Sequence, residues 1–246
     1  MVPERPAPFA HDDTLRRCLT ANLAAHPVRP IDDPTARRAA VAVLVVPSEV
    51  GSDDHDPSPD VPAPMTGVPG DTAGFDGTVS GVAGGAALVL CRRAATLHRH
   101  GGQWAFPGGR ADGDETPEQT ARRELLEEVG VELGDDAVIG RLDDYRTRSG
   151  YVMTPVVMWA DDIELVPDPA EVANAYRIGV HELCRSDSPR MVSIPESDRP
   201  VVQLPIGRDI LHAPTGAVLL QFRLVALEGR IGERVHHLEQ PVFAWR

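Results

Sequence analysis

The sequence has 246 residues, 42% of them hydrophobic and only 4% aromatic, which suits one domain with a mostly aliphatic core. Its formal charge of −13 opposes binding to a nucleic-acid backbone, and all 24 basic residues are arginines, which excludes a P-loop or Schiff-base lysine. There is no apolar run of membrane-spanning length, no signal-peptide pattern and no disulfide framework among the three scattered cysteines, so we expect a cytoplasmic location without membrane contact.

The first 35 residues predict a short helical extension. A helix is expected at Asp13–Ala25, with Asp12 or Asp13 as its N-cap and two prolines, Pro27 and Pro30, beyond its end. We therefore divide the chain into an extension, residues 1–35, and a main domain, residues 36–246.

An insertion interrupts a predicted hairpin at the start of the main domain. Ala39–Val46 and Ala86–Leu90 are continuous apolar runs of strand length. The stretch between them, residues 47–85, is rich in Pro, Gly, Asp and Ser and has few large apolar side chains. Such a composition buries too little surface to offset its ordering entropy, so we expect a disordered or loosely held segment.

The rest of the chain mixes helices and strands. Pro117–Val129 predicts a clear helix, and a second helix is expected from Pro169 to about Tyr176. Further predicted strands are Ala137–Tyr145, Tyr151–Ala160, Val201–Leu204, Ala217–Leu227 and Val242–Trp245. Because these elements do not alternate regularly, the pattern favours an α+β fold over a doubly wound sheet.

The helix at Pro117–Val129 is delimited by local chemistry. Thr116 is a good N-cap, Pro117 occupies the first helical position, and Gln119 completes a capping box. Gly130 supplies the C-terminal stop. At about 100° per residue, an apolar stripe of Ala121, Leu125 and Val129 lies beside an acidic arc of Glu124, Glu127 and Glu128.

Three carboxylates so close together repel one another. A divalent cation would remove that repulsion, because Mg²⁺ prefers carboxylate oxygens together with substrate phosphates. Arg123, four residues before Glu127, can brace the acidic group. Alternatively, the acidic face of the helix is simply exposed to solvent and binds no metal.

The spacing around this helix favours the metal site. Five residues separate Gly109 from Glu115, and seven more separate Glu115 from Arg123. Starting at Arg123, the chain reads RELLEEVGV. This resembles the Nudix box, GX5EX7REUXEEXGU with U aliphatic, at every defined position. The resemblance implies a Nudix hydrolase in residues 36–246, with an α/β/α sandwich around a mixed central sheet.

The resemblance also implies roles for the residues that match the box. Glu124, Glu127 and Glu128 would bind Mg²⁺ or Mn²⁺, and Glu115 would lie near the metals. The backbone carbonyl of Gly109 would coordinate, and Arg123 would orient the acids. The general base is left open between Glu124 and Glu171, although for Glu171 taken alone a surface or helix-start role is the better explanation.

The segment before the box, RAATLHRHGGQWAFPGG, resembles the extra motif of the coenzyme A diphosphatases within the Nudix group. The stretches YVMTPVV and PDPAEV also resemble that subgroup. Three motif positions differ: threonine is Cys91, serine is Ala94 and an arginine is His98. Cleavage of CoA or acyl-CoA to 4′-phosphopantetheine and adenosine 3′,5′-bisphosphate is the implied reaction.

A dense basic cluster in this acidic chain indicates an anionic, phosphate-bearing substrate. The residues we expect to bind it are Arg92, Arg93, His98, Arg99, His100 and Gln103. The two arginines could instead merely solvate a strand end. Two other functions stay open: a Nudix hydrolase of another nucleoside diphosphate derivative, such as ADP-ribose or a dinucleotide, and a ligand-sensing domain without catalysis. Because Nudix proteins are often dimers, a homodimer is also open.

Overall fold

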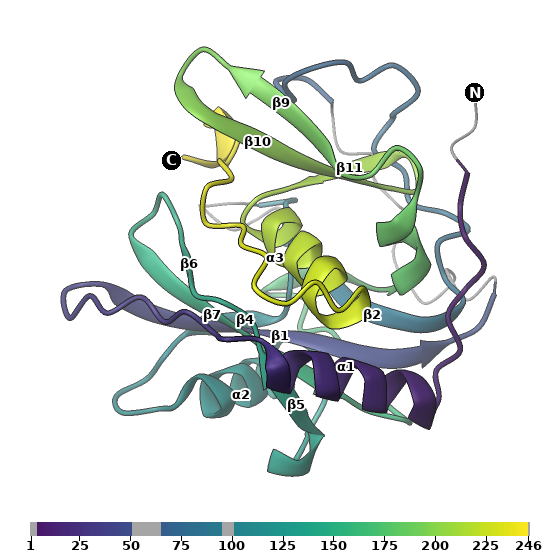
Figure 1. Ribbon diagram of the computed structural model, residues 1–246, viewed down its shortest axis with the longest axis vertical. Helices are drawn as coiled ribbons and strands as arrows, with labels where there is room; N and C mark the ends of the chain where they lie inside the picture. Colours follow the sequence, from purple (N-terminus) through teal and green to yellow (C-terminus); the bar gives the residue numbers. More distant parts are fainter. Residues whose placement is uncertain (1–3, 51–64, 95–100, 246) are drawn as a thin grey trace.

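The computed structural model describes residues 4–50, 65–94 and 101–245 (Figure 1). Its larger sheet has the strand order β3-β2-β1-β7-β5, with β4 paired to β1, β6 to β7 and β8 to β2. The strands are β1 (Arg37–Ser48), β2 (Gly85–Arg93), β3 (Trp104–Ala105), β4 (Gly108–Arg110), β5 (Val138–Arg141), β6 (Tyr145–Arg146), β7 (Tyr151–Trp159) and β8 (Val172–Gly179). Because β1 and β7 are parallel and the other pairs antiparallel, the sheet is mixed.

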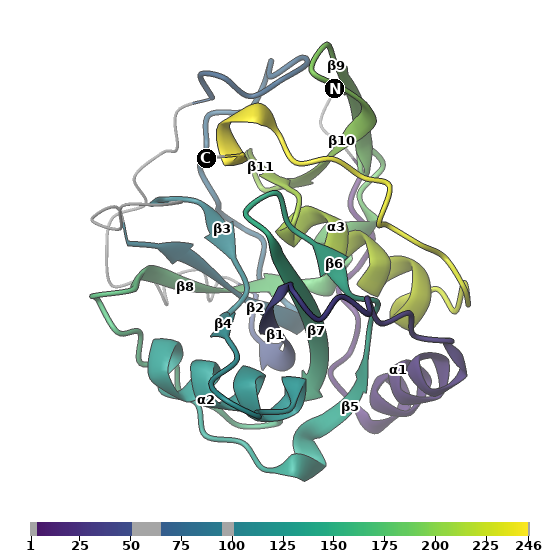
Figure 2. The ribbon, with the colours of Figure 1, turned by 90° about the vertical axis from the view of Figure 1, so that its left-hand side faces the viewer.

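The central strand β1 is buried on both faces, and its alternating side chains define two cores. One set, Ala42 among them, packs with Leu125 of helix α2 (Pro117–Val129), and the other, Val43 among them, packs with the C-terminal elements. Figure 2 shows α2 on one side of the sheet and helices α1 (Asp13–Ala25) and α3 (Thr215–Gln221) on the other. The expected α+β class and α/β/α sandwich are therefore confirmed.

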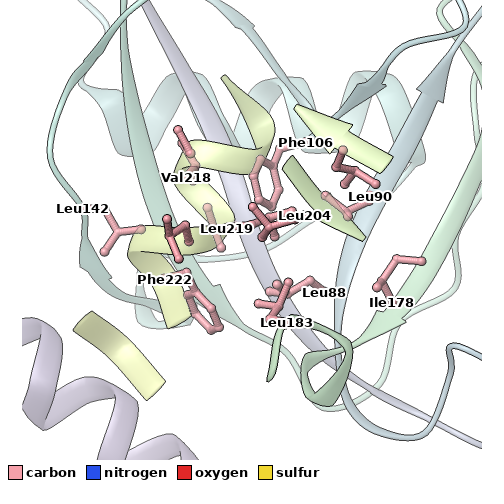
Figure 3. Packing of buried hydrophobic residues seen from close by; sticks show 14 of the residues in the cluster. Leu88, Leu90, Phe106, Leu142, Ile178, Leu183, Leu204, Val218, Leu219 and Phe222 are labelled. Atoms are coloured by element: carbon pink, nitrogen blue, oxygen red, sulfur yellow. The ribbon is translucent and has the colours of Figure 1, made fainter. Parts of the chain in front are cut away.

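A second sheet covers the side of the larger sheet that faces away from α2. It consists of β9 (Arg190–Ile194), β10 (Ser197–Ile206) and β11 (Asp209–His212), in the order β11-β10-β9. Figure 3 shows Leu204 of β10 packed with Leu90 of β2 and Leu219 of α3. The remaining elements are the short helices η2 (Asp135–Ala137), η3 (Val180–Cys184), η4 (Phe222–Leu227) and η5 (Val242–Ala244).

The N-terminal helix forms where the sequence predicts it. Asp12 is its N-cap, because its carboxylate accepts hydrogen bonds from the backbone amides of Thr14 and Leu15. Buried Leu19 and Leu23 join it to the core on the α3 side. Within the described residues, no helix combines the length and the apolar character that a bilayer crossing requires.

Three predicted elements were wrong. Ala217–Leu227 is not a strand but lies in α3 and η4, because a mostly apolar run fits a buried helix as well as a strand. Val242–Trp245 forms the short η5 turn rather than a strand. Pro169–Tyr176 is not helical: its second half belongs to β8, which pairs with β2 along its length.

The predicted strand at Ala137–Tyr145 is divided between β5 and β6. The predicted loose insertion is wrong for residues 65–84. Val82 is 2% exposed, and the backbone amides of Asp76 and Gly77 both donate to the carbonyl of Arg208 in the turn between β10 and β11. Residues 51–64 of the insertion lie outside the described part of the chain.

The apolar stripe of α2 sets the position of the acidic face. We expect Leu125→Ala to lower the free energy of unfolding by about 2–5 kcal/mol, because Leu125 is completely buried and truncation leaves a cavity. The matched control is Leu126→Ala on the 46% exposed face, which should change it by less than about 0.5 kcal/mol. Urea unfolding measures both, and equal effects would contradict this packing.

Candidate active site

The local sequence fixes both ends of α2. The Thr116 hydroxyl accepts from the backbone amide of Gln119 at 3.3 Å, and the Gln119 side chain accepts from the Thr116 amide at 2.9 Å. Gly130 ends the helix with φ 72°, a left-handed conformation that glycine adopts at low cost. The predicted capping box and stop are confirmed, and they set which residues share the acidic face.

Arg123 connects the acids of the box. Its Nε atom lies 2.9 Å from Glu115 Oε1, and its Nη1 atom lies 2.8 Å from Glu124 Oε1 and 2.9 Å from Glu127 Oε2. A further bond from Nη2 reaches the carbonyl of Arg110 at 2.8 Å. The planar guanidinium therefore holds three carboxylates and the β4 backbone in one arrangement.

Glu115 is the most strongly held of these acids. Besides Arg123, the backbone amide of Asp112 and the hydroxyl of Thr120 each donate to its Oε2 atom at 3.0 Å. The pKa of Glu115 is lowered to about 2, and the hydrogen bond from Arg123 is the largest cause. With these partners in place, Glu115 braces Arg123 and the loop.

Glu124 lies against the backbone of Gly109. A Cβ atom at that position would come within 2.4 Å of Glu124 Oε1, so any other residue would displace the carboxylate. Its side chain is 12% exposed, and burial raises the pKa of Glu124 despite the opposing contact with Arg123. The invariant spacing between Gly109 and Glu124 in the box thus has a steric reason.

Glu128 is the most buried acid of the helix. Its side chain is 4% exposed, its Oε2 atom accepts from the backbone amide of Gly108 at 3.0 Å, and Arg93 Nη1 lies 3.7 Å from its Oε1 atom. Burial raises the pKa of Glu128 to about 7, with further upward contributions from the charges of Glu124 and Glu171. Glu127, by contrast, is 57% exposed.

Glu171 joins this group from outside the box. It lies in the turn before β8, where its backbone carbonyl accepts from the amide of Ala94 at 2.8 Å. Its charge raises the pKa values of both Glu124 and Glu128. Since no helix begins here, the helix-start explanation of Glu171 is wrong; the residue is exposed, and its charge reaches the acids of α2.

The donors suit a divalent cation only in part. Among residues 4–50, 65–94 and 101–245, no three His, Cys, Asp or Glu side chains lie close enough to hold a metal by themselves. A magnesium site, however, commonly uses one or two carboxylates and completes its shell with water and phosphate oxygens. Glu124 and Glu128 fit that requirement, because both are charged groups that burial disfavours without a cation.

The structure separates the two arginines predicted to bind substrate. Consecutive strand residues point to opposite faces, so Arg93 lies beside Glu128 while Arg92 points toward the second sheet. Arg92 is 6% exposed and donates to Asp209 and to the carbonyl of Gly77, so its prediction as a substrate ligand is wrong.

Gln103 is half-buried beside Arg93, whose amide donates to its carbonyl at 3.0 Å. The predicted ligands His98, Arg99 and His100 lie outside the described residues. Sequence reasoning missed Asp209, the partner of Arg92. No motif marks it, because the contact spans 117 positions.

The family comparison agrees with this geometry. A model of the NUDIX domain matches residues 77–195, which include β2, the box and β8. Residues 77–195 are thus similar to a Nudix domain. The matched stretch holds Arg93, Glu171 and all the box acids, whereas α1, β11 and α3 lie outside it.

Relatives with similar sequences carry Nudix names. A Photorhabdus laumondii protein named "Uncharacterized Nudix hydrolase NudL" is 41% identical over 97 residues, 39% of this chain and 52% of that protein. A Yersinia pestis protein of the same name is also 41% identical over 97 residues, 39% of this chain and 49% of that protein. The chain thus spans about half the length of the curated relatives it matches.

Solved structures also resemble the chain. A MutT/nudix family protein from Enterococcus faecalis has a TM-score of 0.46 at 15% identity, covering 79% of this chain and 64% of that one. The NUDIX domain of Shewanella oneidensis NrtR, complexed with ADP ribose, has a TM-score of 0.42 at 16% identity, covering 78% and 91%. Such low scores carry no conclusion about substrate or mechanism.

The raised pKa of Glu128 predicts a pH dependence. Because Glu128 titrates at about 7 in the folded protein and near 4.5 when unperturbed, the folded state binds the proton more tightly. The metal-free protein should therefore lose stability as the pH rises from 4.5 to about 7. Thermal unfolding with EDTA should show this loss in the parent and in Glu118→Gln but not in Glu128→Gln. A slope that Glu128→Gln leaves unchanged would contradict the assignment.

The bracing role of Arg123 predicts that lysine cannot replace it. Arg123→Lys keeps the charge but loses the planar set of donors, and should lower the free energy of unfolding by about 1–3 kcal/mol. Its neighbour provides the control: Arg122 pairs with Asp135, whose side chain is 89% exposed, and Arg122→Lys should cost less than about 1 kcal/mol. Denaturant unfolding measures the free energy of unfolding of both variants, and equal losses would contradict the bracing role.

Proposed function

We propose that this chain is a divalent-metal-dependent hydrolase that cleaves the diphosphate linkage of coenzyme A or acyl-CoA. The observation that carries the proposal is a group of three acids, Glu124, Glu128 and Glu171, in which the charge of Glu171 raises the pKa values of the other two. They come from α2 and from the turn before β8, and Arg93 lies beside them. Glu124 and Glu128 are largely buried whereas Glu171 is exposed, and buried carboxylates are costly without a cation.

The acids would hold Mg²⁺ or Mn²⁺, with Glu124 and Glu128 as the principal ligands, Glu127 on the exposed side and the Gly109 carbonyl as a backbone donor. When bound, the cation neutralises charge on the phosphoryl oxygens and makes a water molecule more acidic. Mg²⁺ usually shares its shell with substrate phosphates, so the diphosphate would lie against the same helix.

Each side chain of the cluster has a separate task in this proposal. Arg123 keeps Glu124 and Glu127 in place, and Arg93 neutralises a phosphate oxygen beside Glu128. The proton of the attacking water would go to a carboxylate oxygen of Glu171 or Glu124. Glu171 is the more available acceptor, because Glu124 already accepts from Arg123, whereas Glu171 has no side-chain partner among the described residues.

The choice of CoA rests on the motif before the box and on Arg93, which can bind phosphate bidentately. Two of the three departures from that motif are internal: Cys91 is 1% exposed and Ala94 is 5% exposed. Neither side chain is placed to contact a substrate from solvent, so these departures do not remove polar groups from the site surface. The products would be 4′-phosphopantetheine, or its acyl form, and adenosine 3′,5′-bisphosphate.

A second candidate is hydrolysis of another nucleoside diphosphate derivative, such as ADP-ribose or a dinucleotide. The third departure, His98, favours it, since the motif's arginine is absent there. A ligand-sensing domain without catalysis is the third candidate, but it gives no reason for a complete set of box acids.

Substrate comparison tests the proposal. With Mg²⁺ or Mn²⁺, we expect CoA to be cleaved faster than ADP-ribose or NADH, with release of adenosine 3′,5′-bisphosphate detected by chromatography and mass spectrometry. Preferred cleavage of ADP-ribose or NADH would favour the second candidate. Binding of these compounds without any cleavage would favour the ligand-sensing domain.

A matched pair of variants on α2 connects that activity to the acids. Glu124→Gln should reduce kcat/KM by more than about tenfold, the scale seen when metal-site groups are altered. Glu118→Gln should leave it nearly unchanged, because Glu118 pairs with Arg141 on the first turn instead of joining the cluster. Equal activity of the two variants would show that hydrolysis does not depend on the acids of the box.

A further inference from the structure

A buried carboxylate connects the second sheet to the strands beside the candidate site. Asp209, in β11, is 2% exposed, and its Oδ2 atom lies 2.6 Å from Arg92 Nη2 and 2.6 Å from Trp104 Nε1. Arg92 lies in β2 and Trp104 in β3, the strands before and after residues 95–103. One oxygen atom therefore holds both strands.

Trp104 is held from several sides. The Arg92 guanidinium lies 4.6 Å above its ring, and the ring of Tyr176 in β8 lies 4.9 Å away. Its backbone carbonyl accepts from the hydroxyl of Thr215, the first residue of α3, at 3.0 Å. Contacts from β11 and α3, both outside residues 77–195, thus fix the position of β3.

These contacts bear directly on the candidate site. Anchoring Arg92 on one face of β2 directs the next side chain, Arg93, to the other face, where it lies beside Glu128. The backbones of β2 and β3 are joined by the bond from Arg93 N to Gln103 O at 3.0 Å. Four residues beyond Trp104, Gly108 donates its amide to Glu128.

It also has to be explained why a charged side chain, Asp209, is buried where the two sheets meet. A buried carboxylate is costly, and an apolar contact would join two sheets at least as well. Its charge-assisted bonds to two donors instead fix direction as well as distance. Directional control matters here because Arg92 and Trp104 lie in the strands next to Arg93, the arginine proposed to bind phosphate.

We propose that Asp209 is a positioning residue, through which the second sheet sets the placement of Arg93 and of residues 101–110 for substrate binding. The proposal rests on the proposed function, because it assumes that the substrate phosphates lie beside Arg93. Asp209 itself acts through Arg92 and Trp104 and touches no substrate.

Asp209→Asn is the main test. Oδ1 of Asp209 accepts from the amide of Ile210 at 2.7 Å and Oδ2 accepts from the two side chains, so either orientation of an asparagine turns its NH₂ toward a donor. We expect KM for CoA to rise about tenfold, the scale of one charge-assisted hydrogen bond, while kcat stays nearly unchanged.

Asp143→Asn is the matched control. Asp143 is 6% exposed and accepts from His26, Gln221 and Arg234, so it is a similar buried junction, and none of its hydrogen bonds within the described residues reaches β2 or β3. It should lose stability without a change in KM. If Asp209→Asn likewise changes stability but not KM, Asp209 is structural only and the proposal is overturned.

Hydrogen–deuterium exchange gives a readout that needs no activity. The amides of residues 101–110 should exchange faster in Asp209→Asn than in the parent, but not in Asp143→Asn. Unchanged exchange would overturn the positioning role, whereas absence of any diphosphate cleavage would overturn only the proposed function. If Asp209→Asn does not fold, Trp104→Phe removes one donor but keeps the ring, and should shift KM and exchange in the same direction.

Discussion

The burial of charged acids on α2, to which their mutual repulsion adds, is the constraint on which the rest of the site depends. Glu124 and Glu128 are held in partly buried places where their negative charge is disfavoured. Arg123 offsets part of that cost by bonding to Glu124, Glu127 and Glu115. We propose that a bound cation offsets the remainder, while the apolar stripe around Leu125 holds the helix against the sheet.

Strand alternation assigns different tasks to adjacent residues at the end of β2. Arg93 faces the acids of α2, whereas Arg92 faces the second sheet and Asp209. Electrostatics near the site therefore depend on packing on the opposite side of the sheet. Elements outside residues 77–195, β11 and α3, contact the segment that leads into the box.

Features fixed by neighbouring residues could be predicted from the sequence. The capping box at Thr116, the stop at Gly130 and the acidic arc of α2 all follow from local chemistry and helical periodicity. Features fixed by distant partners could not. Ala217–Leu227 is equally apolar as a strand or a helix, and only its packing beside β10 decides. Arg92 and Arg93 differ only in the face to which each points, and Asp209 carries no motif.

Glu124 and Glu128 of α2 are proposed to hold a divalent cation on the side that faces Glu171. Anomalous diffraction from crystals soaked in Mn²⁺ tests it most directly, because the signal locates the metal without assuming an activity. The account predicts a peak within bonding distance of carboxylate oxygens of Glu124 and Glu128, on the side that faces Glu171. Saturating Mn²⁺ with no peak there, or those carboxylates turned into bulk solvent, would contradict it.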